Sequence, residues 1–182
     1  MELKFDFAQS ATRAAIVEQL KAALGDAAWE AAAAQAESAR FDQDHYHHIG
    51  DVNEAIDALD VPARVKDDMH GVYAILAQAE ATVHECEVEH THFHEVGNAS
   101  ALRNALLICL AIAALDPERI TATPVQTGSG KVKCAHGLMD IPAPATAAIL
   151  ATGIPVCADK LEGELCTPTS AAMIKHFVQE FE

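Results

Sequence analysis

Two short clusters contain six of the ten histidines in this chain of 182 residues. They consist of His45, His47 and His48, and of His90, His92 and His94. On an extended segment residues i, i+2 and i+4 share one face, so the second cluster would project three imidazoles together. On a helix only its first and last histidines would align. Either geometry provides at least one pair of imidazoles that could chelate a metal ion, and we expect the two clusters to converge on one site.

Neutral imidazole is a ligand that suits nickel, zinc and copper. Glu95 follows the second cluster directly and could be a further ligand, or an acceptor that fixes the tautomer of a ligating ring. The alternative interpretation is a polar strand whose histidines only face water. The H-x-H spacing also occurs in cupin barrels, but this chain has too many helical segments and too few strands for that fold.

Cys134 and His136 stand two residues apart and form a softer pair of candidate ligands, a thiolate and an imidazole. Taken alone, this pair is better explained by a small buried cysteine beside a histidine in a turn. His136 becomes a candidate ligand of the common site because a chain of this length has little room for several separate sites.

Two further segments could bind the phosphate of a nucleotide-like ligand. The backbone amides of Gly128, Ser129 and Gly130 could approach a phosphate, although such a segment is more often a simple turn. Thr167 and Thr169 place hydroxyls at the expected start of a helix, where anions bind, and N-capping explains them equally well. The chain contains no P-loop, no dinucleotide-binding fingerprint and no nucleophile elbow.

The spacing of apolar residues predicts the elements that must position these side chains. We expect helices over about residues 10–24, 27–39, 51–61, 62–83, 98–115, 145–150 and 167–181. The expected N-caps are Ser10, Asn98 or Ser100, and Thr167 or Thr169. We expect short strands over 120–125, 131–134 and 154–158, a loop over 40–50, and a strand or extended loop over 89–95.

Helices that alternate with short strands indicate an α+β or α/β fold, a helix-rich single domain with a small mixed sheet. Within this fold we expect an alanine-rich helical N-terminal segment, residues 1–40, followed by the motif-bearing domain, residues 41–182.

The formal charge of −15 argues against nucleic acid, which needs a basic patch, and against anionic membranes. The longest apolar run, residues 105–115, is far shorter than the roughly 20 residues that span a bilayer. Five cysteines without a C-x-x-C pair, and a start without a secretory signal, favour free thiols in a reducing compartment. We therefore expect a cytoplasmic protein that binds neither nucleic acid nor membranes.

From residue 92 the chain reads H-F-H-E-V-G, and further motifs follow in order. They are T-P at 123–124, G-S-G at 128–130, K-C-A-H-G at 133–137, I-P-A-P-A-T at 141–146 and G-E-L-C-T-P-T at 163–169. Over about residues 42–176 these motifs resemble those of the nickel-insertion proteins. Members of this family are LarC-type nickel chelatases, which put nickel into pyridinium-3,5-bisthiocarboxylic acid mononucleotide, the pincer cofactor of lactate racemase. Residues 45–52 are similar to the family's histidine-rich segment, and residues 77–84 to its A-E-A-x-V-H stretch.

The resemblance implies a metal-binding protein with Ni²⁺ as the expected metal and Zn²⁺ as the alternative. It also implies a nucleotide-like small molecule as ligand and the activity of a nickel chelatase, in the lyase class. The metal ligands would then come from His45, His47, His48, His90, His92, His94, Glu95, Cys134 and His136, and the cofactor contacts from Gly128, Ser129, Gly130, Thr167 and Thr169.

The chain also departs from the family pattern. The family's N-terminal D-x-x-x-G-x-x-G-D-M pattern has no counterpart, and Ser100 and Asn104 stand where the family has two aspartates. Since the resemblance covers the N-terminal half of the family, we expect a partial or accessory member, with a partner protein that supplies the C-terminal half. A homo-oligomer is a further expectation. The alternatives are a non-catalytic interaction or regulatory domain that kept the fold, and an unrelated metal-dependent hydrolase.

Overall fold

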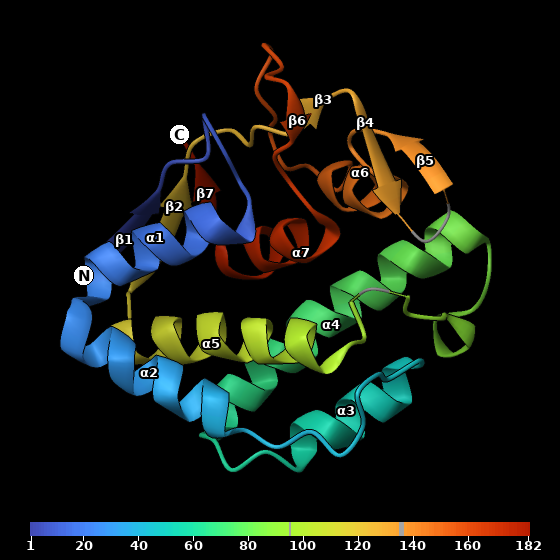
Figure 1. Cartoon of the computed structure of the whole chain (residues 1–182). Coiled ribbons are helices and arrows are strands. Elements are labelled where there is room, and N and C mark those ends of the chain that lie inside the picture. Colours follow the sequence, from blue (N-terminus) through green and yellow to red (C-terminus); the bar gives the residue numbers. More distant parts are fainter. Residues whose placement is uncertain (95, 135–136) are drawn as a thin grey trace.

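The computed structural model describes residues 1–94, 96–134 and 137–182. A parallel three-stranded sheet lies near both chain termini, with the strand order β1 (Glu2–Phe5), β2 (Arg119–Ala122) and β7 (Glu180–Phe181) (Figure 1). Leu3 and Phe5 of β1 are buried, while Glu2 and Lys4 are exposed. This alternation is that of a strand with one face on the core.

Helices form the rest of the core around two long central ones. The central helices are α4 (Ala63–His84) and α5 (Ala99–Leu115). Around them pack α1 (Arg13–Leu24), α2 (Asp26–Ser38), α3 (Ile49–Asp57), α6 (Pro144–Leu150) and α7 (Pro168–Phe177). α4 contacts α3, α5, α6 and α7, and α5 contacts α1 and α2 (Figure 1). Apolar side chains recur along both central helices, so each buries a stripe against its neighbours.

The remaining strands form two short antiparallel pairs. β4 (Lys131–Cys134) and β5 (Gly137–Asp140) form an antiparallel hairpin, and β3 (Gly128–Ser129) pairs with β6 (Gly163–Glu164). Figure 1 shows the hairpin above the end of α4, and the 3₁₀ helix η1 (Val88–His90) follows α4 on that side. The hairpin, η1 and the C-terminal end of α4 therefore lie on the same side of the molecule (Figure 1).

The structure confirms a mixed α+β single domain that is rich in helix. Within the described chain, the parallel and the antiparallel strand pairs lie in separate small sheets. Segment 89–95 begins within a 3₁₀ turn, and residues 91–94 continue as an extended loop and not as a strand. Within the described ranges, no helix is long and apolar enough to cross a membrane.

The strand predictions need several corrections. The sequence does not predict β1 or β5, because four residues of mixed polarity give too short an alternation. The strand expected at 154–158 is wrong, since only Val156 forms an isolated bridge, with Val125. Gly128 and Ser129 form β3, where the sequence suggests a turn.

The helix boundaries also shift by a few residues. Thr12, and not Ser10, caps α1 by accepting a hydrogen bond from the Ala15 amide, while the Ser10 hydroxyl contacts that of Thr12. The last helix ends at Phe177, and the chain then returns to the sheet as β7. The predicted caps of α5 and α7 resolve to Asn98 and Thr167.

The first 40 residues pack into the same core as the rest of the chain. Phe5, Phe7 and Leu20 belong to one buried cluster with side chains of α4 and α5. The two alanine-rich helices predicted in this segment are confirmed as α1 and α2, with Gly25 between them at a φ of 82°. The division at residue 40 stays a prediction.

Candidate functional site

The two histidine clusters lie on chain segments that run side by side in opposite directions. The Tyr46 amide donates to the Gly97 carbonyl at 2.8 Å, and the Phe93 amide donates to the His47 carbonyl at 2.8 Å. An antiparallel bridge joins His45 to Asn98. These backbone contacts hold segments 44–48 and 91–98 against each other, although long stretches of sequence separate them.

Buried aromatic residues alternate with the histidines and direct them outward. Tyr46 and Phe93 are 1% and 0% exposed. The Phe93 ring packs edge-on against Tyr73 of α4, whose hydroxyl donates to the Val96 carbonyl at 3.0 Å. Because successive side chains of an extended chain point to opposite sides, each buried aromatic leaves its two neighbouring histidines on the outer side.

The imidazoles of the two segments form a continuous series of ring contacts. Ring centroids are 4.4 Å apart for His45 and His47, and 4.7 Å apart for His47 and His92. His92 also contacts His48 at 5.4 Å and His94 at 5.1 Å. Two imidazoles that ligate one metal at about 2 Å have ring centroids roughly 4.5–5.5 Å apart, depending on the angle between the two bonds at the metal. The spacing of these five rings, called here the histidine cluster, therefore suits a transition metal.

Backbone carbonyls fix the tautomer of two rings in the cluster. His45 donates through Nε2 to the Phe93 carbonyl at 2.8 Å, and His48 donates through Nδ1 to the Thr91 carbonyl at 3.0 Å. In the neutral rings this leaves a lone pair on Nδ1 of His45 and on Nε2 of His48. Metal-ligating histidines commonly donate their second nitrogen to a backbone carbonyl in this way, which orients the ligand nitrogen.

The neighbouring groups favour the neutral form of His47. Desolvation lowers the pKa of its imidazole, and the nearby rings of His45, His92 and His48 lower it further, against an opposing effect of Asp51. Since only neutral imidazole can bind a metal, the surroundings of His47 keep it competent as a ligand.

The rings do not yet surround a common point. Among the residues that the structure describes, no three histidine, cysteine, aspartate or glutamate side chains converge as a metal site. His47 and His92 stack with an interplanar angle of 22°. His45 and His48 are held by their backbone carbonyl partners, whereas His47, His92 and His94 are exposed, and exposed side chains change rotamer within nanoseconds. Ring rotation on a fixed backbone is thus the rearrangement that metal binding requires here.

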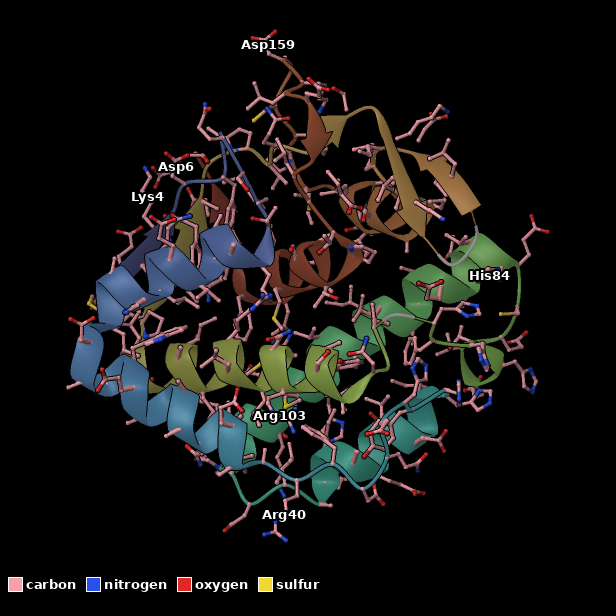
Figure 2. All side chains as sticks on the ribbon, in the orientation of Figure 1. Lys4, Asp6, Arg40, His84, Arg103 and Asp159 are labelled. Atoms are coloured by element: carbon pink, nitrogen blue, oxygen red, sulfur yellow. The ribbon has the colours of Figure 1, made fainter. Side chains whose placement is uncertain are left out.

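A cavity of about 380 Å³ adjoins the cluster at His94. Apolar side chains form much of its wall, among them Val83 of α4, Val96, Val132 of β4, Met139 of β5 and Pro144 of α6. Its polar lining consists of Glu80, His84, His94, Lys133, Glu164 and Thr167. Figure 2 shows His84 at the C-terminal end of α4, on the side of the β4–β5 hairpin. The volume lies within the range of about 300–1,000 Å³ typical of small-molecule sites.

The family of the chain follows from comparison with known proteins. The nickel insertion protein family matches residues 4–182. A pyridinium-3,5-bisthiocarboxylic acid mononucleotide nickel insertion protein of Desulfitobacterium hafniense is 39% identical over 138 residues, which are 75% of this chain and 34% of that protein. A protein of the same name from Staphylococcus saprophyticus is 42% identical over 136 residues, 74% of this chain and 34% of that protein.

The chain belongs to the nickel insertion protein family. A putative nickel insertion protein of Rhodopirellula baltica is 38% identical over 137 residues, 75% of this chain and 34% of that protein. The chain thus spans about a third of the length of the curated relatives that it matches. No solved structure matches it. The family match also extends the resemblance, seen in the sequence over about 42–176, to nearly the whole chain.

Not every histidine predicted as a ligand of this family member joins the cluster. His90 is exposed at the end of η1, and the ring contacts found in the described chain do not include it. Glu95 and His136 lie outside the described residues, as does the side chain of Cys134, so their roles as ligands stay predictions.

The predicted phosphate contacts separate into two groups. Thr167 lines the cavity and also caps α7 by accepting from the Ser170 amide at 3.3 Å. The other candidates, Gly128, Ser129, Gly130 and Thr169, are not among the lining residues. The Gly128 amide donates to Gln126 Oε1, and the Ser129 hydroxyl donates to the Leu161 carbonyl. A phosphate role for these four residues stays a prediction.

The two positions where the family has aspartates hold neutral side chains in α5. The Ser100 hydroxyl donates to Asn98 Oδ1 at 2.6 Å, beside the start of the helix. Asn104 accepts a hydrogen bond from the Arg13 guanidinium at 3.3 Å. A guanidinium at this position favours an anion or a neutral oxygen over a cation.

The site predictions omit four polar residues of the cavity wall. Glu80 and His84 form an i, i+4 pair on α4, with His84 Nε2 3.4 Å from Glu80 Oε2. Lys133 belongs to β4 and Glu164 to β6. The i, i+4 spacing is visible in the sequence, but its relation to Lys133 and Glu164 depends on the tertiary fold. The sequence motifs contain these four residues, but they do not predict that the four side chains line one cavity.

Proposed function

We propose that this chain binds Ni²⁺ at the histidine cluster and presents it to a pyridinium mononucleotide held in the adjoining cavity. The observation that carries the proposal is that His94 belongs to the histidine cluster and also lines a cavity of suitable size. The names of the relatives supply the identity of the metal and of the acceptor. Nickel is here the cargo of the reaction, and Zn²⁺ is the competitor that imidazole ligands also accept.

The length that the chain shares with its relatives suggests that it performs only part of nickel insertion. Because the chain corresponds to about a third of those proteins, we propose that it supplies metal and acceptor binding. A partner chain or a further segment would then complete insertion. A non-catalytic interaction domain is the alternative, and it predicts that the histidine cluster has no specific affinity for nickel.

Titration of the purified, tag-free chain with NiCl₂ tests the proposed function. We expect saturable binding of about one Ni²⁺ per chain with a Kd below about 1 µM, measured by calorimetry in competition with a chelator of known affinity. Zn²⁺ is expected to compete for the same site. Weak binding without a defined stoichiometry would reject the proposal and favour the interaction domain.

The cavity wall indicates how the acceptor is held. Apolar side chains can pack on a pyridinium ring, and Lys133 offers an ammonium group to the phosphate. Thr167 lies at the N-terminus of α7 and adds a hydroxyl on the same wall. A mononucleotide phosphate carries about −1.5 to −2 charges at pH 7, so the loss of one ammonium partner should have a measurable effect.

Replacing Lys133 by alanine is expected to weaken binding of the acceptor about tenfold, since a hydrogen bond to a charged group contributes about 1.5–3 kcal/mol. The probe is pyridinium-3,5-dicarboxylate mononucleotide, the oxygen counterpart of the natural acceptor, and calorimetry gives its Kd. Lys131→Ala is the matched control, because Lys131 lies on the same strand but pairs with Asp140 and does not line the cavity. Equal losses in both variants would contradict a specific contact with Lys133.

Nickel affinity is expected to fall as the pH decreases from 7.5 to 5.5. Protons compete with the metal for imidazole, whose ordinary pKa is about 6.5, so each ligating ring should contribute up to about a tenfold loss. The lowered pKa of His47 makes that ring resist protonation longer than an ordinary histidine. Calorimetry at the two pH values measures the change, and an affinity independent of pH would exclude histidine ligands.

A further inference from the structure

His94 occupies a position that the other rings of the cluster do not share. Its ring centroid is 5.1 Å from that of His92, so it belongs to the histidine cluster. It also lines the cavity, together with His84 and Val96. Among the described histidines of the cluster, His94 is the one that reaches both places.

We propose that His94 is the transfer ligand, the residue that holds nickel at the border of the cluster while the acceptor in the cavity replaces the other imidazoles. This inference rests on the proposed function and adds the order in which the ligands bind nickel. Nickel would first bind the outer rings, would then be held by His94, and would finally pass to the mononucleotide.

The hydrogen bonds of His45 and His48 support this order of binding. His45 and His48 are each tied by one nitrogen to the backbone carbonyls of Phe93 and Thr91. Their ligand nitrogens can therefore turn little, and they suit capture and storage of the metal. His94 lies one step beyond Phe93 and faces the cavity wall formed by α4 and β4. Among the described rings of the cluster, His94 is therefore the one placed to hold a metal that moves from the cluster to the cavity.

The transfer step is a ligand exchange without oxidation or reduction. A thiocarboxylate sulfur of the acceptor supplies the electron pair of the new Ni–S bond. The departing imidazole keeps the electron pair of the Ni–N bond and becomes neutral and free. Nickel remains divalent throughout, and His94 is the last imidazole to leave.

A linkage experiment tests the role of His94. In the wild-type chain we expect pyridinium-3,5-dicarboxylate mononucleotide to raise nickel affinity about tenfold, because its carboxylate can join His94 on the metal. In His94→Ala we expect this increase to vanish, while the affinity for nickel alone falls by less than about tenfold and the affinity for the probe alone changes by less than about threefold. His90→Ala is the matched control, as an exposed histidine of the same segment, and should retain the full increase.

The possible outcomes distinguish failure of the proposed function from failure of the transfer role of His94. A wild-type chain that binds neither nickel nor the probe would reject the proposed function, and with it the transfer role. A wild-type chain that binds both without mutual enhancement would overturn the transfer role alone, as would an undiminished enhancement in His94→Ala. Loss of enhancement in His94→Ala with its retention in His90→Ala supports the proposal.

Discussion

Joint replacement of His47 and His92 by alanine is expected to lower nickel affinity by more than about 100-fold. The rings of His47 and His92 stack at a centroid distance of 4.7 Å and connect the two histidine segments. His45 contacts His47, and His48 and His94 contact His92, so the double variant removes the ring contacts that link the cluster. Removal of groups that merely orient metal ligands already lowers affinity about 10- to 100-fold, and loss of two ligands should exceed that. Competition calorimetry with a chelator measures the difference.

His90→Ala is the matched control for this double variant. The sequence places His90 in the same H-x-H-x-H run, whereas the structure shows it exposed at the end of η1. We expect its replacement to change nickel affinity by less than about twofold. If His90→Ala weakened binding as strongly as the double variant, the assignment of the cluster to five rings would be wrong.

Gly97→Ala is expected to destabilise the fold and to weaken nickel binding together. A Cβ at this position would lie 2.0 Å from the Tyr46 carbonyl oxygen and 3.0 Å from Phe93 Cβ, so the two histidine segments would have to separate. Overpacking of this kind lowers the free energy of unfolding by about 1–3 kcal/mol. Each kcal/mol corresponds to about 2–4 °C in Tm for a chain of this size. Thermal unfolding and a nickel titration on the same sample test both effects.

Gly50→Ala provides the control for a glycine replacement in the neighbouring segment. A Cβ at Gly50 meets no atom within 4 Å, and this residue lies in the first turn of α3. Alanine favours helix more than glycine does, so Tm should stay unchanged or rise slightly. A Gly97→Ala variant as stable as Gly50→Ala, with full nickel affinity, would show that the close approach of the two segments is not needed.

The histidine segments show how far the sequence alone can predict the site. The alternation of His92, Phe93 and His94 predicts two imidazoles on one face, because side chains of an extended chain alternate with a period of two. The sequence does not show that His48 lies beside Thr91, 43 residues away, or that His45 reaches the Phe93 carbonyl. Those contacts depend on the close approach at Gly97, which is a property of the folded chain.

Element type was easier to predict than strand pairing, for a physical reason. α4 and α5 have long apolar stripes and recognisable starts, so their helical period is evident. β1 and β7 have only four and two residues, and they become strands because β2 lies between them. The cavity was not predictable from motifs, since Lys133 and His84 meet only through the packing of the hairpin over α4.

X-ray absorption at the nickel K-edge of the nickel-loaded, tag-free chain tests whether the histidine cluster binds the metal. We expect at least three imidazole ligands at about 2.0–2.1 Å, recognised by the multiple scattering of their rings. A spectrum that contains only oxygen ligands from water and carboxylates would contradict the claim that the histidine cluster holds the metal. Loss of all nickel on desalting would contradict it equally.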